Sequence, residues 1–327
     1  MTLRLTVESD AWQTHVKAVV TQFGDVLPVV KGNGYGFGRS VLMPHAAAIS
    51  SDVAVGSIYE LSEVPSNLRP FVLTPLGSGV TPMARSSEIR PDAVLTVGSE
   101  RDLRVIGDLG LRNPVVIKVE SSMHRYGIPA SEADELRKRT ESEGHPVVAW
   151  SVHLPLAGSD EEHADEAISL GGHLSTDLPL HLSHIGAAIR RVRAATSHRV
   201  VVRTGTHLWL GDKSMVSMHT DVIAVRSTMA SAAGYRATTI TARSNVSTAD
   251  GRLRLIMVGC GSSNGISALE NGSSPFHFAR QRLDLLEPPH MHTSMLLGAS
   301  TPCPEPGDWI DVQQPMTRVQ PDAIVWR

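Results

Sequence analysis

Val29-Val30-Lys31-Gly32-Asn33-Gly34-Tyr35-Gly36-Phe37-Gly38 decides how the rest of the chain is interpreted. The apolar residues before Lys31 predict a buried strand, and the pattern from Arg39 onward predicts a helix. Lys31 is therefore expected at the carboxyl end of a strand, where parallel α/β proteins place their functional groups. The alternating glycines favour a sharp turn that lets the backbone approach a ligand closely.

Lys31 admits two interpretations. A lysine held beside apolar side chains can lose its proton and form a Schiff base with an aldehyde such as pyridoxal 5'-phosphate (PLP). Tyr35 follows four residues later and is then available to bond an anionic group. The alternative is a surface lysine beside a flexible loop, and this stretch alone does not choose between the two.

The composition narrows the class of protein. The 327 residues are enough for two modest domains or for one large domain. A net charge of −3 argues against nucleic acid as the main partner, and no apolar run is long enough to span a membrane. The N-terminal residues lack the pattern of a signal peptide, and Cys260 and Cys303 form no metal-ligand pattern. We therefore expect a cytoplasmic protein with no disulfide, no bound metal and no membrane contact.

Short apolar runs alternate with helical patterns over the first two thirds of the chain. This alternation predicts an α/β fold with a parallel sheet, and the number of units favours a closed, TIM-like (β/α)8 barrel. Besides the strand before Lys31, the expected strands are 53–55, 71–73, 93–95, 115–117, 147–150 and 200–202. The expected helices lie near 11–20, 99–109, 130–143, 160–171 and 183–194.

The pattern changes after the last expected barrel strand. Alternating segments at 238–241 and 253–258 are separated by polar loops rich in glycine and serine, which predicts an antiparallel β domain. The sequence thus predicts a barrel domain over residues 1–213 and a C-terminal β domain over residues 214–327.

Lys118 and Arg125 form a second motif. Lys118 ends the expected strand at 115–117, and Arg125 lies in the loop after it. Arginine keeps its proton, so Arg125 would offer a fixed positive charge to a phenolate or a carboxylate. Because two unpaired cations repel each other, a negative group is expected between them. The alternative is a solvated basic loop.

Arg203, Gly205 and Thr206 repeat this arrangement after the expected strand at 200–202. Free backbone N–H groups and the Thr206 hydroxyl would hold a phosphate. The three motifs together predict one lysine, two arginines and a phosphate-binding loop at the carboxyl ends of the strands.

With these motifs the chain resembles the alanine racemase family, which are PLP enzymes with an N-terminal (β/α)8 barrel and a C-terminal β domain. The resemblance implies that Lys31 is the Schiff-base lysine and one of two racemisation bases, with Tyr35 at the phosphate. Arg125 would bond the phenolic oxygen of PLP and contact the substrate. Lys118, whose equivalent is often carbamylated in relatives, would supply the missing negative group.

The remaining cofactor contacts follow from the same resemblance. Arg203 would face the pyridine nitrogen, and Gly205 and Thr206 would lie at the phosphate. His153 would lie against the ring. His184 stands where relatives have an asparagine at the phosphate.

The C-terminal part departs from the family pattern. Relatives carry a catalytic tyrosine in a Gly-Tyr-Ala-Asp-Gly stretch, and the matching stretch here places Cys260 at the tyrosine position. Met291 is kept where relatives bind the substrate carboxylate, and His292 replaces the aspartate that follows. The second base is therefore expected to be Cys260 or His292, with His290 as a further candidate.

The resemblance implies a PLP-dependent amino-acid racemase or epimerase that works as a homodimer, with each site shared between one barrel and the partner's β domain. Arg203 favours racemisation, because an arginine leaves the pyridine nitrogen unprotonated. A PLP-dependent decarboxylase or lyase is the alternative that Cys260 favours. A non-catalytic PLP-binding protein is the alternative that the missing tyrosine favours.

Overall fold

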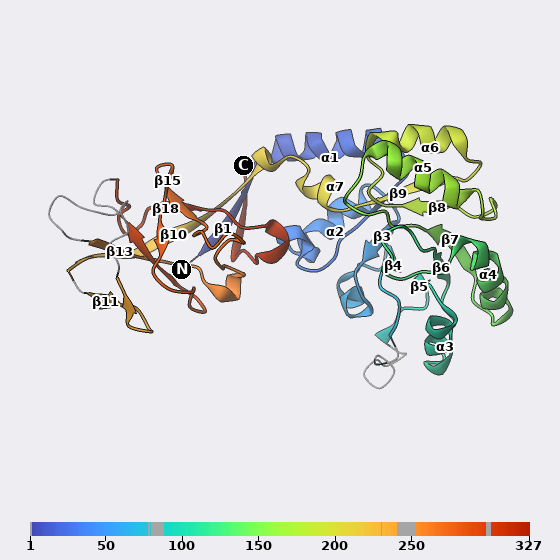
Figure 1. The fold of residues 1–327 in the computed structure, drawn as a ribbon, viewed down its shortest axis with the longest axis horizontal. Helices are drawn as coiled ribbons and strands as arrows, with labels where there is room; N and C mark the ends of the chain where they lie inside the picture. Colours follow the sequence, from blue (N-terminus) through green and yellow to red (C-terminus); the bar gives the residue numbers. More distant parts are fainter. Residues whose placement is uncertain (1, 78, 80–87, 230, 241–252, 299–301) are drawn as a thin grey trace. The chain divides into compact units, whose positions relative to one another are not determined.

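The computed structural model describes residues 2–77, 79, 88–229, 231–240, 253–298 and 302–327 (Figure 1). The chain forms two compact units, each described here by itself. One comprises His15–Gly34 and Arg39–Gly211, and the other comprises Met1–Thr14, Tyr35–Gly38 and Asp212–Arg327. The sequence pattern assigned the whole of 1–213 to the first domain, whereas the first residues and Tyr35–Gly38 group with the C-terminal unit.

Eight parallel strands close into a barrel in the first unit. Six of them form one sheet in the order β2-β9-β8-β7-β6-β5, and β3 pairs with β4. Single bridges between Val29 and Ala54 and between Phe71 and Val94 join the two sheets at both ends. The (β/α)8 prediction is therefore confirmed. The strands are β2 (Val26–Pro28), β3 (Asp52–Val55), β4 (Arg69–Val72), β5 (Leu95–Val97), β6 (Val115–Lys118), β7 (Val147–Ser151), β8 (Leu180–Leu182) and β9 (Val200–Thr204).

Helices follow the strands and cover their outer face, as Figure 1 shows for α3 to α6 around β5 to β9. Several of these helices begin at a side chain that caps their N-terminus. The Ser99 hydroxyl accepts from the N–H of Asp102 at the start of α3, and Ser159 and Glu162 form a capping box at the start of α5. The helices are α1 (Ser9–Phe23), α2 (Arg39–Ala47), α3 (Glu100–Asp108), α4 (Ala133–Ser142), α5 (Asp160–Gly171), α6 (Ile189–Ala195) and α7 (Thr206–Leu210).

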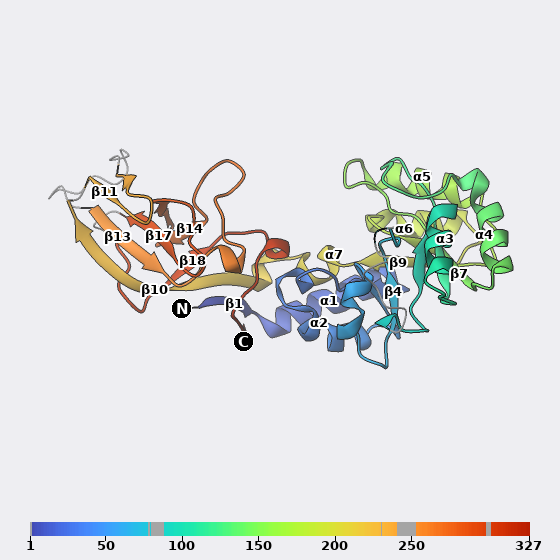
Figure 2. The same cartoon turned by 90° about the horizontal axis from the view of Figure 1, so that it is seen from below.

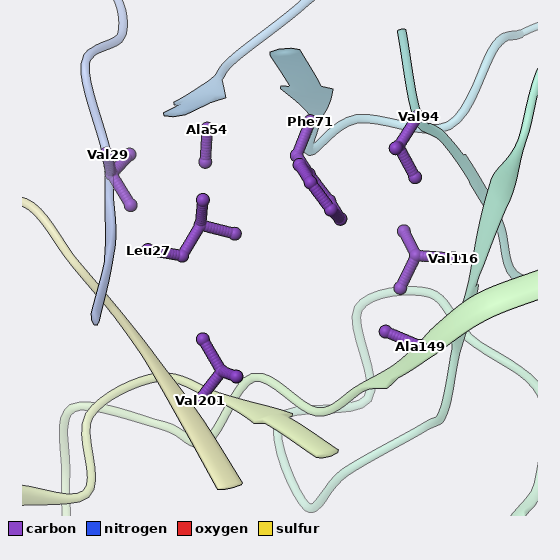
Figure 3. Close-up of a cluster of buried hydrophobic side chains, with 8 residues drawn as sticks. All are labelled: Leu27, Val29, Ala54, Phe71, Val94, Val116, Ala149 and Val201. Carbon is purple, nitrogen blue, oxygen red and sulfur yellow. The ribbon is translucent and has the colours of Figure 1, made fainter. Parts of the chain in front are cut away.

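Side chains from successive strands fill the barrel interior. Alternate residues of a strand point to opposite faces, so each strand sends one or two side chains inward. Figure 3 shows eight of them converging, with Phe71 the largest: Leu27, Val29, Ala54, Phe71, Val94, Val116, Ala149 and Val201. β8 contributes His181, which is buried with its ring 5.5 Å from that of Phe71.

His181 makes the barrel sensitive to acid. Burial, assisted by the charge of Arg203, lowers the pKa of His181 to about 3, whereas an unfolded-chain histidine titrates near pH 6.5. Between these values the unfolded chain binds a proton that the folded chain does not. Stability therefore falls by about 1.4 kcal/mol per pH unit as the pH drops from about 6.5 towards 3.

In the His181→Leu variant the protein is expected to lose this contribution. The free energy of unfolding should then depend less steeply on pH, by the amount that corresponds to one proton. Urea unfolding at several pH values between about 4 and 7 measures the slope directly. The exposed His173 gives a matched control variant, His173→Leu, with which the slope of His181→Leu is compared. An unaltered slope in His181→Leu would contradict the assignment.

An antiparallel sheet dominates the C-terminal unit, as the sequence predicts. Its order is β15-β14-β18-β10-β13-β17-β16, and the 13-residue strand β10 is its longest member (Figure 2). The register of β10 shifts between Val222 and Ala224, so that its first half pairs with β1 and β18 and its second half with β13. The strands are β1 (Leu3–Val7), β10 (Val216–Thr228), β13 (Leu253–Val258), β14 (Phe276–Phe278), β15 (Gln281–Arg282), β16 (Asp284–Leu285), β17 (Ser294–Gly298), β18 (Trp309–Val312) and β19 (Ala323–Trp326).

β1 explains why the first residues belong to this unit. It pairs antiparallel with β10 and parallel with β19, and it buries Leu3, Leu5 and Val7 completely. A small separate hairpin pairs β11 (Ala232–Ala233) with β12 (Thr238–Thr239). The expected strand at 238–241 thus ends at Thr239, and residue 241 lies outside the described residues. Within the described part of the chain, no helix has the length and apolar character needed to cross a membrane.

Candidate active site

Lys31 lies in the loop just after β2, at the carboxyl end of the barrel strands. Glu60 holds this loop, because its carboxylate accepts from the N–H of Gly32 at 3.0 Å and from the N–H of Gly56 at 2.6 Å. Arg39 adds a second support by donating to the Gly32 carbonyl and to Glu63. The backbone around Lys31 is therefore fixed by side chains that come from the residues after β2 and β3.

The glycines after Lys31 are required by the turn. Gly34 has φ of 61°, and a Cβ on it would lie 2.5 Å from the backbone nitrogen of Arg39. Any other residue would be strained and would clash with the start of α2. Tyr35 also has a positive φ, is buried, and belongs to the C-terminal unit.

Lys118 ends β6 with its side chain buried in the barrel unit. Its Nζ has no hydrogen-bond partner among the described residues. Burial, together with the charges of Arg203 and Arg125, lowers the pKa of Lys118 to about 6. Lys118 is therefore a largely neutral amine that lacks an acceptor for its protons.

Gly127 lies in the loop after β6. It packs its backbone against Val119 and Glu120 so closely that a Cβ on it would approach the backbone nitrogen of Glu120 to 2.6 Å.

Arg203 lies inside the barrel at the end of β9. It donates to the Ser151 hydroxyl at 2.6 Å and to the Val152 carbonyl at 2.8 Å. Its Nε is buried and has no partner among the described residues. Burial lowers the pKa of Arg203 to about 10, which still leaves it charged at neutral pH. The fixed guanidinium thus presents one N–H that an acceptor from outside the chain would satisfy.

Two histidines lie close together beside these cations. The rings of His153 and His184 are 4.6 Å apart, and His184 Nδ1 lies 2.9 Å from the Leu154 carbonyl, so it carries the proton. Burial and the charge of Arg203 lower the pKa of His153 to about 2, so its imidazole is neutral. A neutral ring here adds no charge to an already positive region.

The electrostatics around Lys31 favour an anionic ligand. Desolvation and the charge of Arg125 lower the pKa of Lys31, and Glu60 opposes that shift only in part. Arg125 is exposed, with its guanidinium 4.5 Å from the Tyr126 ring. Electrostatic interactions between pairs of side chains therefore connect one cluster, which comprises Lys31, Lys118, Arg125, Arg203, His153 and His184.

The remaining predicted residues fall into two groups. Gly205 is buried just after β9, and the exposed Thr206 begins α7 in the same unit. Cys260, Met291 and His292 belong to the C-terminal unit. The described residues contain no group of three or more His, Cys, Asp or Glu side chains able to hold a metal ion.

The surroundings of Cys260 argue against its expected role as a base. The residue is completely buried within the C-terminal unit, and desolvation raises the pKa of its thiol to about 12. Association with a partner would only add to that burial. Met291 and His292, in contrast, are exposed.

Several residues that shape the site do not stand out in the sequence. Ser151 orients Arg203, and Glu60 with Arg39 holds the Lys31 loop. Ser151 directly follows the strand predicted at 147–150, which is the one signal that would have marked it. Glu60 lies in a short 3-10 helix (Ile58–Glu63) that carries no motif.

A closed parallel barrel with a lysine and further basic side chains at its carboxyl end, followed by an antiparallel sheet domain, defines a two-domain α/β-barrel protein. The chain belongs to the alanine racemase family, because the model of the alanine racemase N-terminal domain matches residues 7–212.

Solved structures of alanine racemases share this fold. The alanine racemase from Bartonella henselae, which carries covalently bound pyridoxal phosphate, has a TM-score of 0.73 at 16% identity over 100% of both chains. The biosynthetic enzyme from Pseudomonas aeruginosa has a TM-score of 0.71 at 18% identity, covering 100% of this chain and 99% of its own. The enzyme from E. faecalis has a TM-score of 0.71 at 16% identity, covering 100% and 98%. A comparison with curated protein sequences finds no match.

Proposed function

We propose that this protein is a PLP-dependent amino-acid racemase of the alanine racemase type. The observation that carries the proposal is the group of basic side chains around Lys31, in which Lys118 Nζ and Arg203 Nε are buried without partners among the described residues. Membership of a PLP-dependent family supports the same cofactor.

The residues present fit PLP. The buried Arg203 N–H would be satisfied by the pyridine nitrogen, whose lone pair is an acceptor. Arg125 is the candidate for the phenolic oxygen and for the substrate carboxylate, and the neutral His153 is the candidate for contact with the ring. The candidates for holding the phosphate are Tyr35, His184, Gly205 and Thr206.

Lys31 would both attach the cofactor and transfer protons. When bound, PLP withdraws electrons from the amino acid and so makes its Cα–H acidic. The lowered pKa of Lys31 raises the share of neutral amine near neutral pH, which is the form that takes a proton from one face of Cα.

Racemisation also needs a proton donor on the opposite face of Cα. We assign that group to the C-terminal domain of a partner subunit in a homodimer, with Met291 at the substrate carboxylate. Of the two candidates, Cys260 is buried with a raised thiol pKa, while His292 is exposed. The burial of Cys260 also supports the racemase over a decarboxylase, because Cys260 is the residue that favoured the decarboxylase. We place this activity in the cytoplasm.

Lys118 is expected to carry a carbamate. Its neutral amine adds carbon dioxide and releases one proton, which turns a buried group without a partner into an anion beside Arg203 and Arg125. Carbon-13 NMR of protein equilibrated with labelled bicarbonate should show a carbamate signal that Lys118→Ala lacks. The exposed Lys138 serves as control, and a signal that survives in Lys118→Ala would contradict the assignment.

The deciding experiment follows the α-proton of a panel of L-amino acids by NMR in deuterium oxide, with chiral analysis of the products. Exchange accompanied by the D-isomer supports the racemase. Carbon dioxide release without a D-isomer would identify a decarboxylase instead. Bound PLP with no exchange for any amino acid would identify a non-catalytic binding protein.

A further inference from the structure

The two C-terminal segments singled out in the sequence lie against each other. The N–H of Ser262 donates to the His290 carbonyl at 2.7 Å, and the N–H of Ser263 donates to the Met291 carbonyl at 2.9 Å. Gly261 allows this approach, since a Cβ on it would lie 2.1 Å from the His290 carbonyl oxygen. The loop at the position of the family's tyrosine therefore supports the segment that carries His292.

The Ser263 hydroxyl joins these segments through its side chain. Its oxygen lies 2.5 Å from the Met291 carbonyl oxygen and 3.0 Å from Nδ1 of His292. Two oxygens this close need a proton between them, and the carbonyl has none to give. The Ser263 hydroxyl therefore donates its single proton to the Met291 carbonyl, and the serine oxygen accepts from Nδ1–H of His292.

We propose that Ser263 is a positioning residue that holds His292 with its proton on Nδ1, so that Nε2 is the atom that exchanges protons with Cα. Nδ1–H donates to Ser263 in both the neutral and the charged imidazole. Nε2 can therefore take up the Cα proton, or return one, without breaking the contact with Ser263. Nε2 has no partner among the described residues, and the ring is exposed.

His290, the other candidate, is engaged differently. Its Nε2 lies 2.7 Å from the carboxylate of Glu287, which is itself buried and also accepts from the N–H groups of Tyr235 and Arg236. Nε2 is therefore available in His292 but is occupied by Glu287 in His290. This contrast selects His292 as the base.

The proposal rests on the proposed racemase activity, but its first test does not. Nitrogen-15 NMR of the histidine rings in the full-length protein, without added substrate, reports which nitrogen of His292 is protonated. We expect the Nδ1–H form in the wild type and in Ser263→Thr, and the Nε2–H form preferred by free histidine in Ser263→Ala. Ser262→Ala, at the exposed neighbouring position, should match the wild type. A wild-type His292 that is protonated on Nε2 would overturn the proposal, whether or not the enzyme racemises amino acids.

The second test uses the loaded enzyme. Ser263→Ala is expected to lower kcat by about tenfold with KM unchanged, and Ser263→Thr to restore it. His292→Gln should retain deuterium exchange at Cα of the one enantiomer whose proton Lys31 removes, while interconversion of the L- and D-isomers stops. Undiminished D-isomer formation in His292→Gln would overturn the assignment even if the tautomer is as expected. Absence of all exchange in the wild type would count against the racemase and leave the tautomer result standing.

Discussion

Replacing Lys31 with alanine is expected to abolish covalent attachment of PLP and to lower racemisation by at least about 10³-fold. Lys31 lies in the loop just after β2. The Glu60 carboxylate and the glycine turn hold this loop in place. In the proposed mechanism, removing the Lys31 amine takes away both the attachment point for PLP and the base for one face of Cα. Borohydride reduction followed by peptide mass spectrometry measures attachment, and chiral analysis measures turnover.

The exposed Lys138 provides the control for this experiment, since Lys138→Ala should retain attachment and activity. Lys118 is the informative competitor, because its pKa is also lowered. A pyridoxyl group recovered on the Lys118 peptide of the Lys31→Ala protein would contradict the assignment of Lys31.

Replacing Phe71 with alanine is expected to lower the free energy of unfolding of the barrel by about 3–5 kcal/mol. Phe71 is the largest side chain of the interior cluster, and it packs beside His181 (Figure 3). Because side chains from the other strands surround it, the space left by the ring cannot close fully. Urea unfolding monitored by circular dichroism measures the change.

Tyr59 gives a matched control for this loss. It is aromatic and lies in the same unit, but 59% of its surface is exposed. Tyr59→Ala should change stability by no more than about 0.5 kcal/mol. A loss below about 1 kcal/mol in Phe71→Ala would mean that the barrel interior rearranges to fill the cavity.

Most of the barrel strands were predictable from runs of three or more β-branched or apolar residues, although the strand expected at 93–95 lies at Leu95–Val97. The runs at Val53, Val115, Val147 and Val200 all became strands. β8 was missed because it is three residues long and has a histidine at its centre, so its pattern resembles that of a loop. Its existence depends on pairing with both neighbours, which a local pattern does not contain.

The place of β1 in the C-terminal sheet was not predictable for a similar reason. β1 pairs with strands that are far away in the sequence, and no signal within residues 3–7 reveals those partners. Charged residues that follow strands were easy to identify, as Lys31, Lys118 and Arg203 show. Their partners Ser151 and Glu60 were not, because finding them requires the order and register of the barrel.

The pairing of β1 also sets the order in which the chain folds during synthesis. Leu3 pairs with Thr220, roughly two hundred residues later, so at 5–20 residues per second β10 emerges from the ribosome about 10 to 40 s after β1. All the barrel strands are made in that interval. In the folded protein β1 buries Leu3, Leu5 and Val7 completely. During synthesis this strand therefore remains unpaired until the second unit has been made. Until then it is an exposed apolar segment of the kind that molecular chaperones bind.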